Sequence, residues 1–263
     1  MDLGLQGRAC AVTGASRGIG RETAKLLCAE GADVLLVARS EVRLSEAAGE
    51  CSGGRAETLP LDVTEPDAGE RILAAASERF GQLDVLVNNA GTATRRDLLE
   101  VPDEDWTASF ELNVMAPMRA MRAAVPAMAE RGWGRVVNVS SSSGKRPSGS
   151  TPDYSVAKAA QLSLSRLFAD RYAEQGVLVN AVCPGPVAAE LWMEPGGLLD
   201  QTAEMSGVSR EQALRKFEAA RPIGRLAEVG EIAGAIAFLC SEHASFVSGS
   251  AWSVDGGAVQ VII

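Results

Sequence analysis

Continuous apolar runs of strand length alternate with helical patterns along the whole chain. The runs lie at residues 9–12, 33–38, 58–61, 83–87, 135–139, 177–182 and 250–254. Most of them lack the alternation of apolar and polar residues that a half-exposed strand shows, which is typical of strands covered on both faces. Helical patterns lie between them, at residues 18–29, 40–51, 66–79, 103–130, 153–174 and 227–240. This order predicts an α/β fold, a doubly wound parallel sheet of the Rossmann type with helices on both faces.

Two features depart from this alternation of strand and helix patterns. Pro117 and Pro126 lie inside the fourth helical stretch, and we expect them to bend or break it. Residues 186–222 carry no strand pattern and contain Trp192 and Met193. Long insertions at the ligand side of a sheet are often lids or substrate loops. Because no linker interrupts the chain, we expect a single dinucleotide-binding domain, 1–263, with a substrate-loop segment at about 186–222.

Composition excludes several classes of function. The net charge of −9 argues against nucleic acid or an anionic membrane as the main partner. No apolar segment has the length of a signal-peptide core or a membrane span. The five cysteines are scattered and form no C-x-x-C pair, which indicates free thiols and a cytoplasmic location. With His243 as the single histidine, we expect no metal site built on imidazole.

A glycine-rich turn, residues 13–20, follows the first apolar run and precedes the first helical stretch. Strand, turn and helix in this order form a site for a phosphate, because the helix start offers free N–H groups to an anion. However, the spacing of Gly14, Gly18 and Gly20 is not G-x-G-x-x-G, and residues 14–18 also match the G-x-S-x-G turn of hydrolases, with Ser16 as nucleophile.

The hydrolase alternative needs an oxyanion donor from a loop after an earlier strand. Only fifteen residues precede Ser16, and they contain one strand pattern. A triad would also need His243, whose position near a helix end is typical of a surface residue or a partner of the helix dipole. The turn therefore favours a phosphate cradle.

Tyr154 and Lys158 lie four residues apart on one face of a predicted helix that begins near Pro152. An isolated tyrosine has a pKa of about 10, so it needs a lower pKa to exchange protons near neutral pH. A lysine held close to it favours the phenolate and lowers the pKa. Such a pair also arises on helix surfaces without any function, so the rest of the chain must decide.

The chain resembles the short-chain dehydrogenase/reductase family in its single-domain form, over essentially its whole length. The resemblance rests on motifs in the family's order and spacing: the turn at 13–20, Asp62 after the third run, residues 88–91 (Asn-Asn-Ala-Gly), Asn113, Ser141, Tyr154 with Lys158, Pro184-Gly185 and residues 255–257 (Asp-Gly-Gly). Each motif alone is weak, but together they are highly specific.

The resemblance implies a catalytic set of Asn113, Ser141, Tyr154 and Lys158. Ser141 would bond the substrate carbonyl oxygen, and Tyr154 would exchange a proton with that oxygen. Lys158 would lower the pKa of Tyr154 and hold the nicotinamide ribose, and Asn113 would hold a water in a proton relay. Ser140, Ser142 and Ser143 are adjacent to Ser141, and the family spacing favours Ser141.

The resemblance also implies the cofactor-binding residues. They are Gly14, Ser16, Arg17, Gly18, Ile19, Gly20, Arg39, Asp62, Val63, Asn89, Ala90, Gly91, Tyr154, Lys158, Pro184, Gly185 and Val187. No acid follows the second run to bind a ribose 2′-hydroxyl, whereas Arg39 and Arg17 suit a 2′-phosphate. We therefore expect NADP(H) to be preferred over NAD(H). One departure concerns Ala189, which stands where the family often has a threonine that bonds the cofactor.

These features predict an NADP-dependent oxidoreductase, a ketoreductase acting on a small-molecule carbonyl or alcohol substrate. The alternative is a non-catalytic NADP-binding sensor or scaffold. Leu191, Trp192, Met193, Leu198 and Leu199 indicate an apolar or amphipathic ligand, unless they are core residues. The family implies a homotetramer or homodimer formed through 103–130, 153–174 and the C-terminal segment, and the apolar tail 258–263 would suit such an interface.

Overall fold

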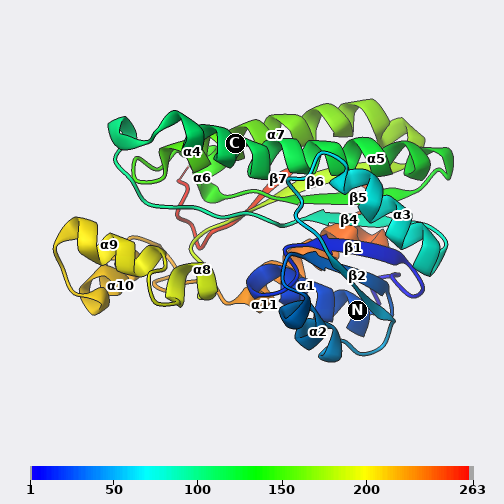
Figure 1. Ribbon diagram of the computed structural model, residues 1–263, viewed down its shortest axis with the longest axis horizontal. Coiled ribbons are helices and arrows are strands. Elements are labelled where there is room, and N and C mark those ends of the chain that lie inside the picture. Colours follow the sequence, from blue (N-terminus) through cyan, green and yellow to red (C-terminus); the bar gives the residue numbers. More distant parts are fainter. Residues whose placement is uncertain (1, 261–263) are drawn as a thin grey trace.

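The computed structural model describes residues 2–260, and within them seven parallel strands form one sheet (Figure 1). The strand order is β3-β2-β1-β4-β5-β6-β7, so the order reverses between β1 and β4. The strands are β1 (Ala9–Thr13), β2 (Asp33–Ala38), β3 (Ala56–Pro60), β4 (Val85–Asn88), β5 (Gly134–Val139), β6 (Val177–Pro184) and β7 (Ala251–Val254). The predicted doubly wound sheet is confirmed. In such sheets ligands bind beyond the carboxyl ends of the strands, at the reversal of strand order.

Helices connect the strands. They are α1 (Gly18–Ala29), α2 (Glu41–Gly49), α3 (Ala68–Phe80), α4 (Asp103–Phe110), α5 (Ala116–Glu130), α6 (Ser142–Lys145), α7 (Pro152–Tyr172), α8 (Glu190–Met193), α9 (Leu198–Ser206), α10 (Arg210–Ala219) and α11 (Val229–Cys240). Short 3₁₀ turns occupy Leu98–Glu100, Ala173–Gln175 and Glu242–Ala244.

The sheet is covered on both faces, which explains why its strands are apolar throughout. On one face, α1, α2 and α11 bury side chains such as Leu27 and Ile236 against the strands. On the other face, α3, α5 and α7 do the same with side chains such as Ile72 and Met121. Figure 1 shows these two layers on opposite sides of the strands. Burial of apolar surface in both layers holds the carboxyl ends of the strands in a common edge.

The prediction that both prolines interrupt the helix at 103–130 is only partly right. Pro117 lies in the first turn of α5, where a missing N–H costs no hydrogen bond. The interruption comes just before it, as a π-helical turn at Glu111–Met115. Pro126 lies inside α5 without ending that helix. Turns of this kind often occur at functional sites, and this one contains Asn113.

The segment between β6 and α11 is helical. It contains α8, α9 and α10, which we call the cap helices, and Figure 1 shows them set apart from the two main layers, below α4. They have a small core of their own, in which Leu199, Ala203 and Ala213 are buried and Trp192 and Phe217 pack against them. The sequence left open whether Leu199 contacts a ligand or belongs to a core, and the structure shows that it is a core residue of the cap.

Three further expectations concern the C-terminal tail, the cysteines and membrane-spanning segments. Of the apolar tail predicted as an interface, residues 261–263 lie outside the described residues. All five cysteines are free thiols. Within residues 2–260 no helix is both long and apolar enough to cross a membrane.

Candidate active site

One large cavity, of about 1220 Å³, lies along the carboxyl edge of the sheet. The residues that line it include all the predicted site residues except Gly20: Gly14, Ser16, Arg17, Gly18, Ile19, Arg39, Asp62, Val63, Asn89, Ala90, Gly91, Asn113, Ser141, Tyr154, Lys158, Pro184, Gly185 and Val187. They come from the segments that directly follow β1, β2, β3, β4, β5 and β6, from the π-helical turn that contains Asn113, and from α7. The fold therefore brings together residues that are up to 173 positions apart in the chain, from Gly14 to Val187.

The glycine turn has the geometry of a cradle. Gly14 and Gly18 have φ angles of 66° and 54°, a region that favours glycine. A Cβ on Gly20 would lie 2.4 Å from Asn89 Nδ2 and from Gly14 O, so Gly20 is required by packing and not by contact with the cavity. The N-cap of α1, Arg17, makes no side-chain cap bond. The first N–H groups of α1 are thus available to an anion such as a diphosphate.

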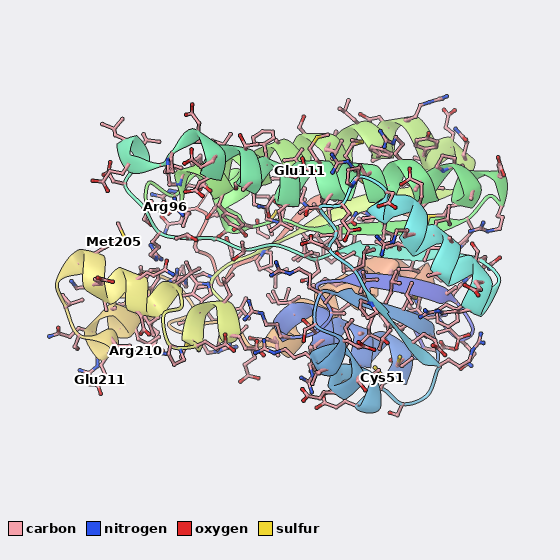
Figure 2. The ribbon with its side chains drawn as sticks, in the orientation of Figure 1. Cys51, Arg96, Glu111, Met205, Arg210 and Glu211 are labelled. Atoms are coloured by element: carbon pink, nitrogen blue, oxygen red, sulfur yellow. The ribbon has the colours of Figure 1, made fainter. Side chains whose placement is uncertain are left out.

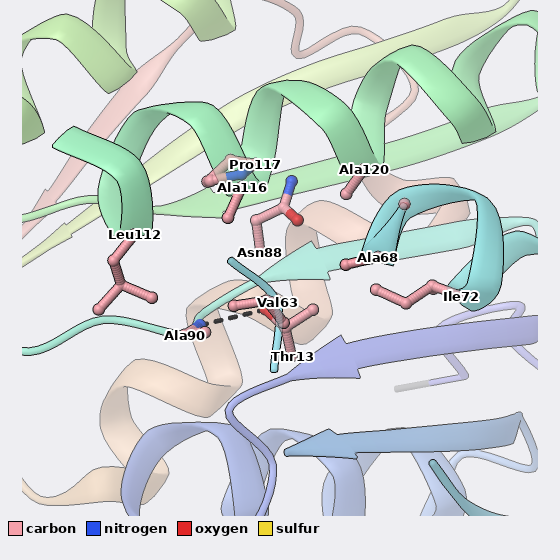
Figure 3. Close-up of a pocket in the computed structure, with 11 residues that line it drawn as sticks. Thr13, Val63, Ala68, Ile72, Asn88, Ala90, Leu112, Ala116, Pro117 and Ala120 are labelled. Atoms are coloured by element: carbon pink, nitrogen blue, oxygen red, sulfur yellow. Dashed lines mark hydrogen bonds between the residues drawn. The ribbon is translucent and has the colours of Figure 1, made fainter. Parts of the chain in front are cut away.

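Asn89 supports the turn through hydrogen bonds in addition to lining the cavity. Its Nδ2 donates to Thr13 O (2.9 Å) and Gly14 O (3.3 Å). Thr13 Oγ1 in turn accepts from the backbone N–H groups of Asn89 (3.0 Å) and Ala90 (3.1 Å), the second of which Figure 3 draws as a dashed line. These bonds tie the loop after β4 to the glycine turn after β1.

A second cavity lies behind these bonds and is far smaller. Its volume is about 10 Å³, and Figure 3 shows its lining, which includes Thr13, Asn88 and Pro117. Asn88 Nδ2 donates to Asn138 Oδ1 (2.8 Å). A space of this size has room for about one water molecule. Only the larger cavity has room for a cofactor and a substrate.

Tyr154 and Lys158 lie one turn apart near the start of α7, and Lys158 Nζ is 5.6 Å from the centre of the Tyr154 ring. Lys158 is only 2 % exposed, and its Nζ donates to Val139 O (2.8 Å) and Gln161 Oε1 (3.1 Å). Burial lowers the pKa of Lys158 to about 7. Burial also raises the pKa of Tyr154 to about 12, although a hydrogen bond with Ser141 acts in the opposite direction.

The expected lowering of the Tyr154 pKa by Lys158 is therefore absent from this structure. The physical reason is that desolvation opposes both charged forms, the phenolate and the ammonium. The structure instead favours a neutral tyrosine that holds its proton at neutral pH. Such a phenol is suited to donate that proton to a carbonyl oxygen.

The serine run is divided by its contacts. Ser140 Oγ is buried and donates to Lys158 O (3.1 Å), so it holds α7 against β5. Ser141 is the N-cap of α6, and its Oγ accepts from Ser143 N (3.0 Å). The bond from Ser143 leaves the Ser141 hydroxyl proton available to the Tyr154 oxygen or to a ligand oxygen. Ser141 is also the serine that bonds Tyr154.

Asn113 presents an unpaired oxygen. Its Nδ2 donates to Ser109 O (2.9 Å), while its Oδ1 is buried and has no partner among the described residues. A Cβ placed on Gly91 would lie 3.1 Å from this Oδ1 and 3.6 Å from Lys158 Nζ. The absence of a side chain at Gly91 therefore leaves space between the two polar groups, of the kind that a bridging water needs.

The far end of the cavity contains positive side chains and one anchored acid. Asp62 Oδ1 accepts from Thr64 N (3.0 Å) and Thr64 Oγ1 (2.7 Å), which lowers the pKa of Asp62. Arg39 Nη1 lies 3.9 Å from Asp62 Oδ2, and its side chain is 82 % exposed. The sequence reasoning missed Ser40 and Arg43, which line the same end. Arg43 could have been found from the sequence, because it is a second cation one turn after Arg39 at the start of a predicted helix.

The cap helices touch the glycine turn. Arg17 Nη1 lies 3.0 Å from Glu194 Oε2, just after α8. Ala189 is the N-cap of α8 and provides no side-chain hydroxyl, and Glu190 Oε2 lies 3.3 Å from the position of a Cβ on Gly18. Where the family often has a threonine, this chain thus places an alanine followed by an acid.

The hydrolase alternative does not survive this geometry. Ser16 lines the large cavity, but His243 does not. His243 Nε2 instead lies 2.7 Å from Asp2 O, in the segment that precedes β1. Because β1 runs from that segment toward the glycine turn, the histidine and the serine lie at opposite ends of the strand. Among the described residues no group of three or more His, Cys, Asp or Glu side chains could hold a metal ion.

A dinucleotide cradle, a tyrosine one helical turn from a buried lysine, and an adjacent serine at one edge of a doubly wound sheet define a nicotinamide-dependent oxidoreductase. Residues 14–259 match the family model described as enoyl-(acyl carrier protein) reductase. The chain is 35% identical to the 3-oxoacyl-[acyl-carrier-protein] reductase of Escherichia coli, over 98% of this chain and 100% of that protein. It is 36% identical to a short-chain reductase protein of Streptomyces niveus, over 94% and 92%.

Solved structures give the same result. L-Sorbose reductase from Gluconobacter frateurii, complexed with NADPH and L-sorbose, superposes with a TM-score of 0.92 at 34% identity, covering 100% of both chains. The chain belongs to the short-chain dehydrogenase/reductase family. It is an oxidoreductase that acts on a carbonyl/CH–OH pair of a small molecule.

Proposed function

We propose that this protein is an NADP-dependent ketoreductase in which Asn113, Ser141, Tyr154 and Lys158 form the catalytic set. The observation that carries the proposal is the position of Tyr154 beside Ser141 and the buried Lys158, in the cavity that begins at the glycine turn. Two relatives are named as reductases of carbonyl compounds, a 3-oxoacyl-[acyl-carrier-protein] and L-sorbose, and the second was solved with NADPH. We also propose that the chain acts as a single domain, that residues 186–222 are its substrate loop, and that it works in the cytoplasm as a homotetramer or homodimer.

When bound, NADPH supplies the hydride. Ser141 donates its hydroxyl proton in a hydrogen bond to the substrate carbonyl oxygen and so orients it. Tyr154 donates its proton to the same oxygen during reduction and removes it during oxidation. Lys158, with a pKa of about 7, is partly charged at neutral pH, and in its charged form it favours the phenolate left by this transfer. Asn113 Oδ1 holds a water that returns a proton through Lys158, a role that its unpaired buried oxygen supports.

The preference for NADP rests on charge at the far end of the cavity. Arg17, Arg39 and Arg43 line it, and no acid stands at the end of β2. Guanidinium groups bind a phosphate through charge-assisted hydrogen bonds, whereas a ribose 2′-hydroxyl is usually bound by an acid. Arg39 is exposed and its contact with Asp62 is long, so it is available to a 2′-phosphate.

Initial rates on a panel of neutral and charged ketones, with NADPH and with NADH, test the proposed function. We expect ketone-dependent oxidation of NADPH with a kcat/KM at least about tenfold above that with NADH, as a charge-assisted phosphate contact of about 1.5–3 kcal/mol implies. Binding of NADPH without turnover on any ketone, and without alcohol oxidation, would instead favour the non-catalytic sensor. A preference for NADH would overturn the cofactor assignment.

A further inference from the structure

Two arginine side chains from different segments lie near the same aromatic ring at the substrate end of the cavity. Arg95 lies in the loop after β4, and Arg221 follows α10; both line the cavity that Tyr154 lines. The guanidinium carbon of each lies 5.1 Å from the centre of the Phe217 ring. Arg95 also lies 5.4 Å from the centre of the Trp192 ring. Two cations thus share one aromatic side chain at a cavity wall.

Neither guanidinium is neutralised by a close acid. Among the described residues no carboxylate oxygen lies within 4.0 Å of Arg95 or Arg221, whereas the nearby Arg96 and Arg210 are paired with Asp105 and Asp200. Figure 2 shows Arg96 between α4 and the cap helices, and Arg210 on the cap. Asp255 acts on Arg221 from a longer distance, and its carboxylate is already used by the N–H groups of residues 257 and 259.

The hydrogen-bonding capacity of both arginines is incompletely used. Arg95 donates from Nε to Leu198 O (3.1 Å) and from Nη1 to Ser150 Oγ. Its Nη2 has no hydrogen-bond partner among residues 2–260. Arg221 donates from Nη1 to Phe217 O, and its Nε is buried with no partner in the described chain. Burial lowers the pKa of both groups, and the charge of Arg221 lowers that of Arg95 further.

The other charged groups that line the cavity do not neutralise Arg95 and Arg221. Of the acidic residues that line the cavity, Asp62 and Asp105 are paired with arginines, and Glu190 lies beside the glycine turn. Asp153 on α7 remains, and the exposed Arg146 adds a further cation. Two half-buried cations with free N–H donors, one of them the buried Nε of Arg221, are costly unless an oxyanion binds to them.

We propose that the carbonyl substrate carries an anionic group, a carboxylate or a phosphate, bound by Arg221 and Arg95, and that Trp192 and Phe217 pack against the carbon chain. The inference rests on the proposed ketoreductase function and adds the substrate class to it. Arg221 is the specificity residue. Arg95 both binds the anion and holds α9 through Leu198, so its replacement would also disturb the cap.

Matched pairs of acid and ester isolate the charge. The kcat/KM values of 5-oxohexanoate and 4-oxo-4-phenylbutanoate are compared with those of their methyl esters, and the value of dihydroxyacetone phosphate with that of dihydroxyacetone. The comparison is made for the wild type and for Arg221→Met, Arg221→Lys and Arg215→Met. Arg215 is exposed on α10 and does not line the cavity, so its variant is the control. The phosphate arm distinguishes the two possible anions. Turnover of the methyl esters shows that each variant is folded.

We expect the wild type to prefer the anionic member of at least one pair by about tenfold in kcat/KM, as a charge-assisted hydrogen bond implies. Arg221→Met should lose this preference while keeping ester turnover, Arg221→Lys should keep part of it, and Arg215→Met should match the wild type. Preference of the wild type for the neutral member of every pair would overturn the inference. Equal losses on acid and ester in Arg221→Met would also overturn it.

A binding experiment separates this inference from the proposed function. If no ketone is reduced, the ketoreductase assignment fails, but binding of 4-phenylbutanoate to the protein saturated with NADP⁺ still reports on the anion site. Calorimetric titration should show saturable binding that 4-phenylbutan-1-ol lacks and that Arg221→Met removes. Equal binding of the acid and the alcohol, or none of the acid, would overturn the anion site.

Discussion

At the scale of single residues, burial is the main influence on the chemistry of the site. Lys158 is buried and Tyr154 is half-buried at the cavity wall, and desolvation shifts their pKa values in opposite directions, to about 12 for Tyr154 and about 7 for Lys158. Both shifts favour the neutral side chains at neutral pH. A neutral phenol is the form that the proposed reduction of a carbonyl consumes.

The pKa of Lys158 has a consequence for stability. An unfolded lysine titrates at about 10.4, so between pH 7 and about 10 the unfolded chain holds more protons than the folded one, and this residue makes stability rise with pH. Lys158→Met removes the effect. In urea unfolding without cofactor, the free energy of unfolding of Lys158→Met minus that of the wild type should therefore decrease from pH 7 to pH 9.

Lys216→Met, which removes an exposed lysine from α10, is the control for the loss of one positive charge. Curves of stability against pH that stay parallel for Lys158→Met and the wild type would contradict the lowered pKa of Lys158.

The serine run allows a second test at this scale. Ser141→Ala removes the hydroxyl that faces Tyr154, so we expect kcat to fall by about 10²–10³-fold, as for loss of an oxyanion donor. Ser140→Ala removes the bond to Lys158 O, which should cost about 1 kcal/mol of stability and affect kcat much less. Rates and thermal unfolding of both variants check this, and the reverse ranking of kcat values would exclude Ser141 as the acting serine.

At the scale of elements, the glycine turn and the cap helices are linked by charge. Arg17 at the N-terminus of α1 is paired with Glu194 after α8, and both side chains are less than half exposed to solvent, at 41 % and 44 %. Glu190 also faces Gly18. The cap thus places negative charge where the cofactor phosphates would bind. Binding of the cofactor must displace this charge, which links the position of α8 to the presence of the cofactor.

Glu194→Gln tests this link. It frees Arg17 and removes one negative charge, so the Kd for NADPH should fall by about two- to fivefold, the range expected for an exposed ion pair of about 0.2–1 kcal/mol. The Kd for NADH should change less, and Glu204→Gln, an exposed acid on α9, should leave both unchanged. Fluorescence titrations give these constants. A weaker binding of NADPH by Glu194→Gln would show that the ion pair supports the cofactor site.

At the scale of the whole molecule, the sheet edge assembles the site, and the sequence could predict most of it. The apolar runs gave the strands and their parallel order, because strands buried on both faces leave a clear pattern. The residues after each strand then had to meet at one edge. Eighteen of the nineteen predicted residues therefore line one cavity, and the exception is Gly20, whose lack of a side chain serves packing.

What the sequence could not predict depends on contacts between distant segments. The π-helical turn that holds Asn113 arises before Pro117, although the prolines suggested breaks at other positions. Arg95 and Arg221 lie near the same ring, that of Phe217, and this depends on how the cap helices lie against the loop after β4. The burial that raises the pKa of Tyr154 is likewise a property of the folded chain and not of the helix spacing.

The central claim is that Tyr154 transfers the proton in an NADPH-dependent reduction of a ketone. The direct measurement is the rate of NADPH oxidation with a ketone substrate by the wild type and by Tyr154→Phe, with the Kd for NADPH determined on the same samples. We predict that Tyr154→Phe loses at least about 10²-fold in kcat, since general acid catalysis contributes 10²–10⁴-fold, while its Kd for NADPH stays within about threefold of the wild type. Retention of turnover by Tyr154→Phe would contradict the account.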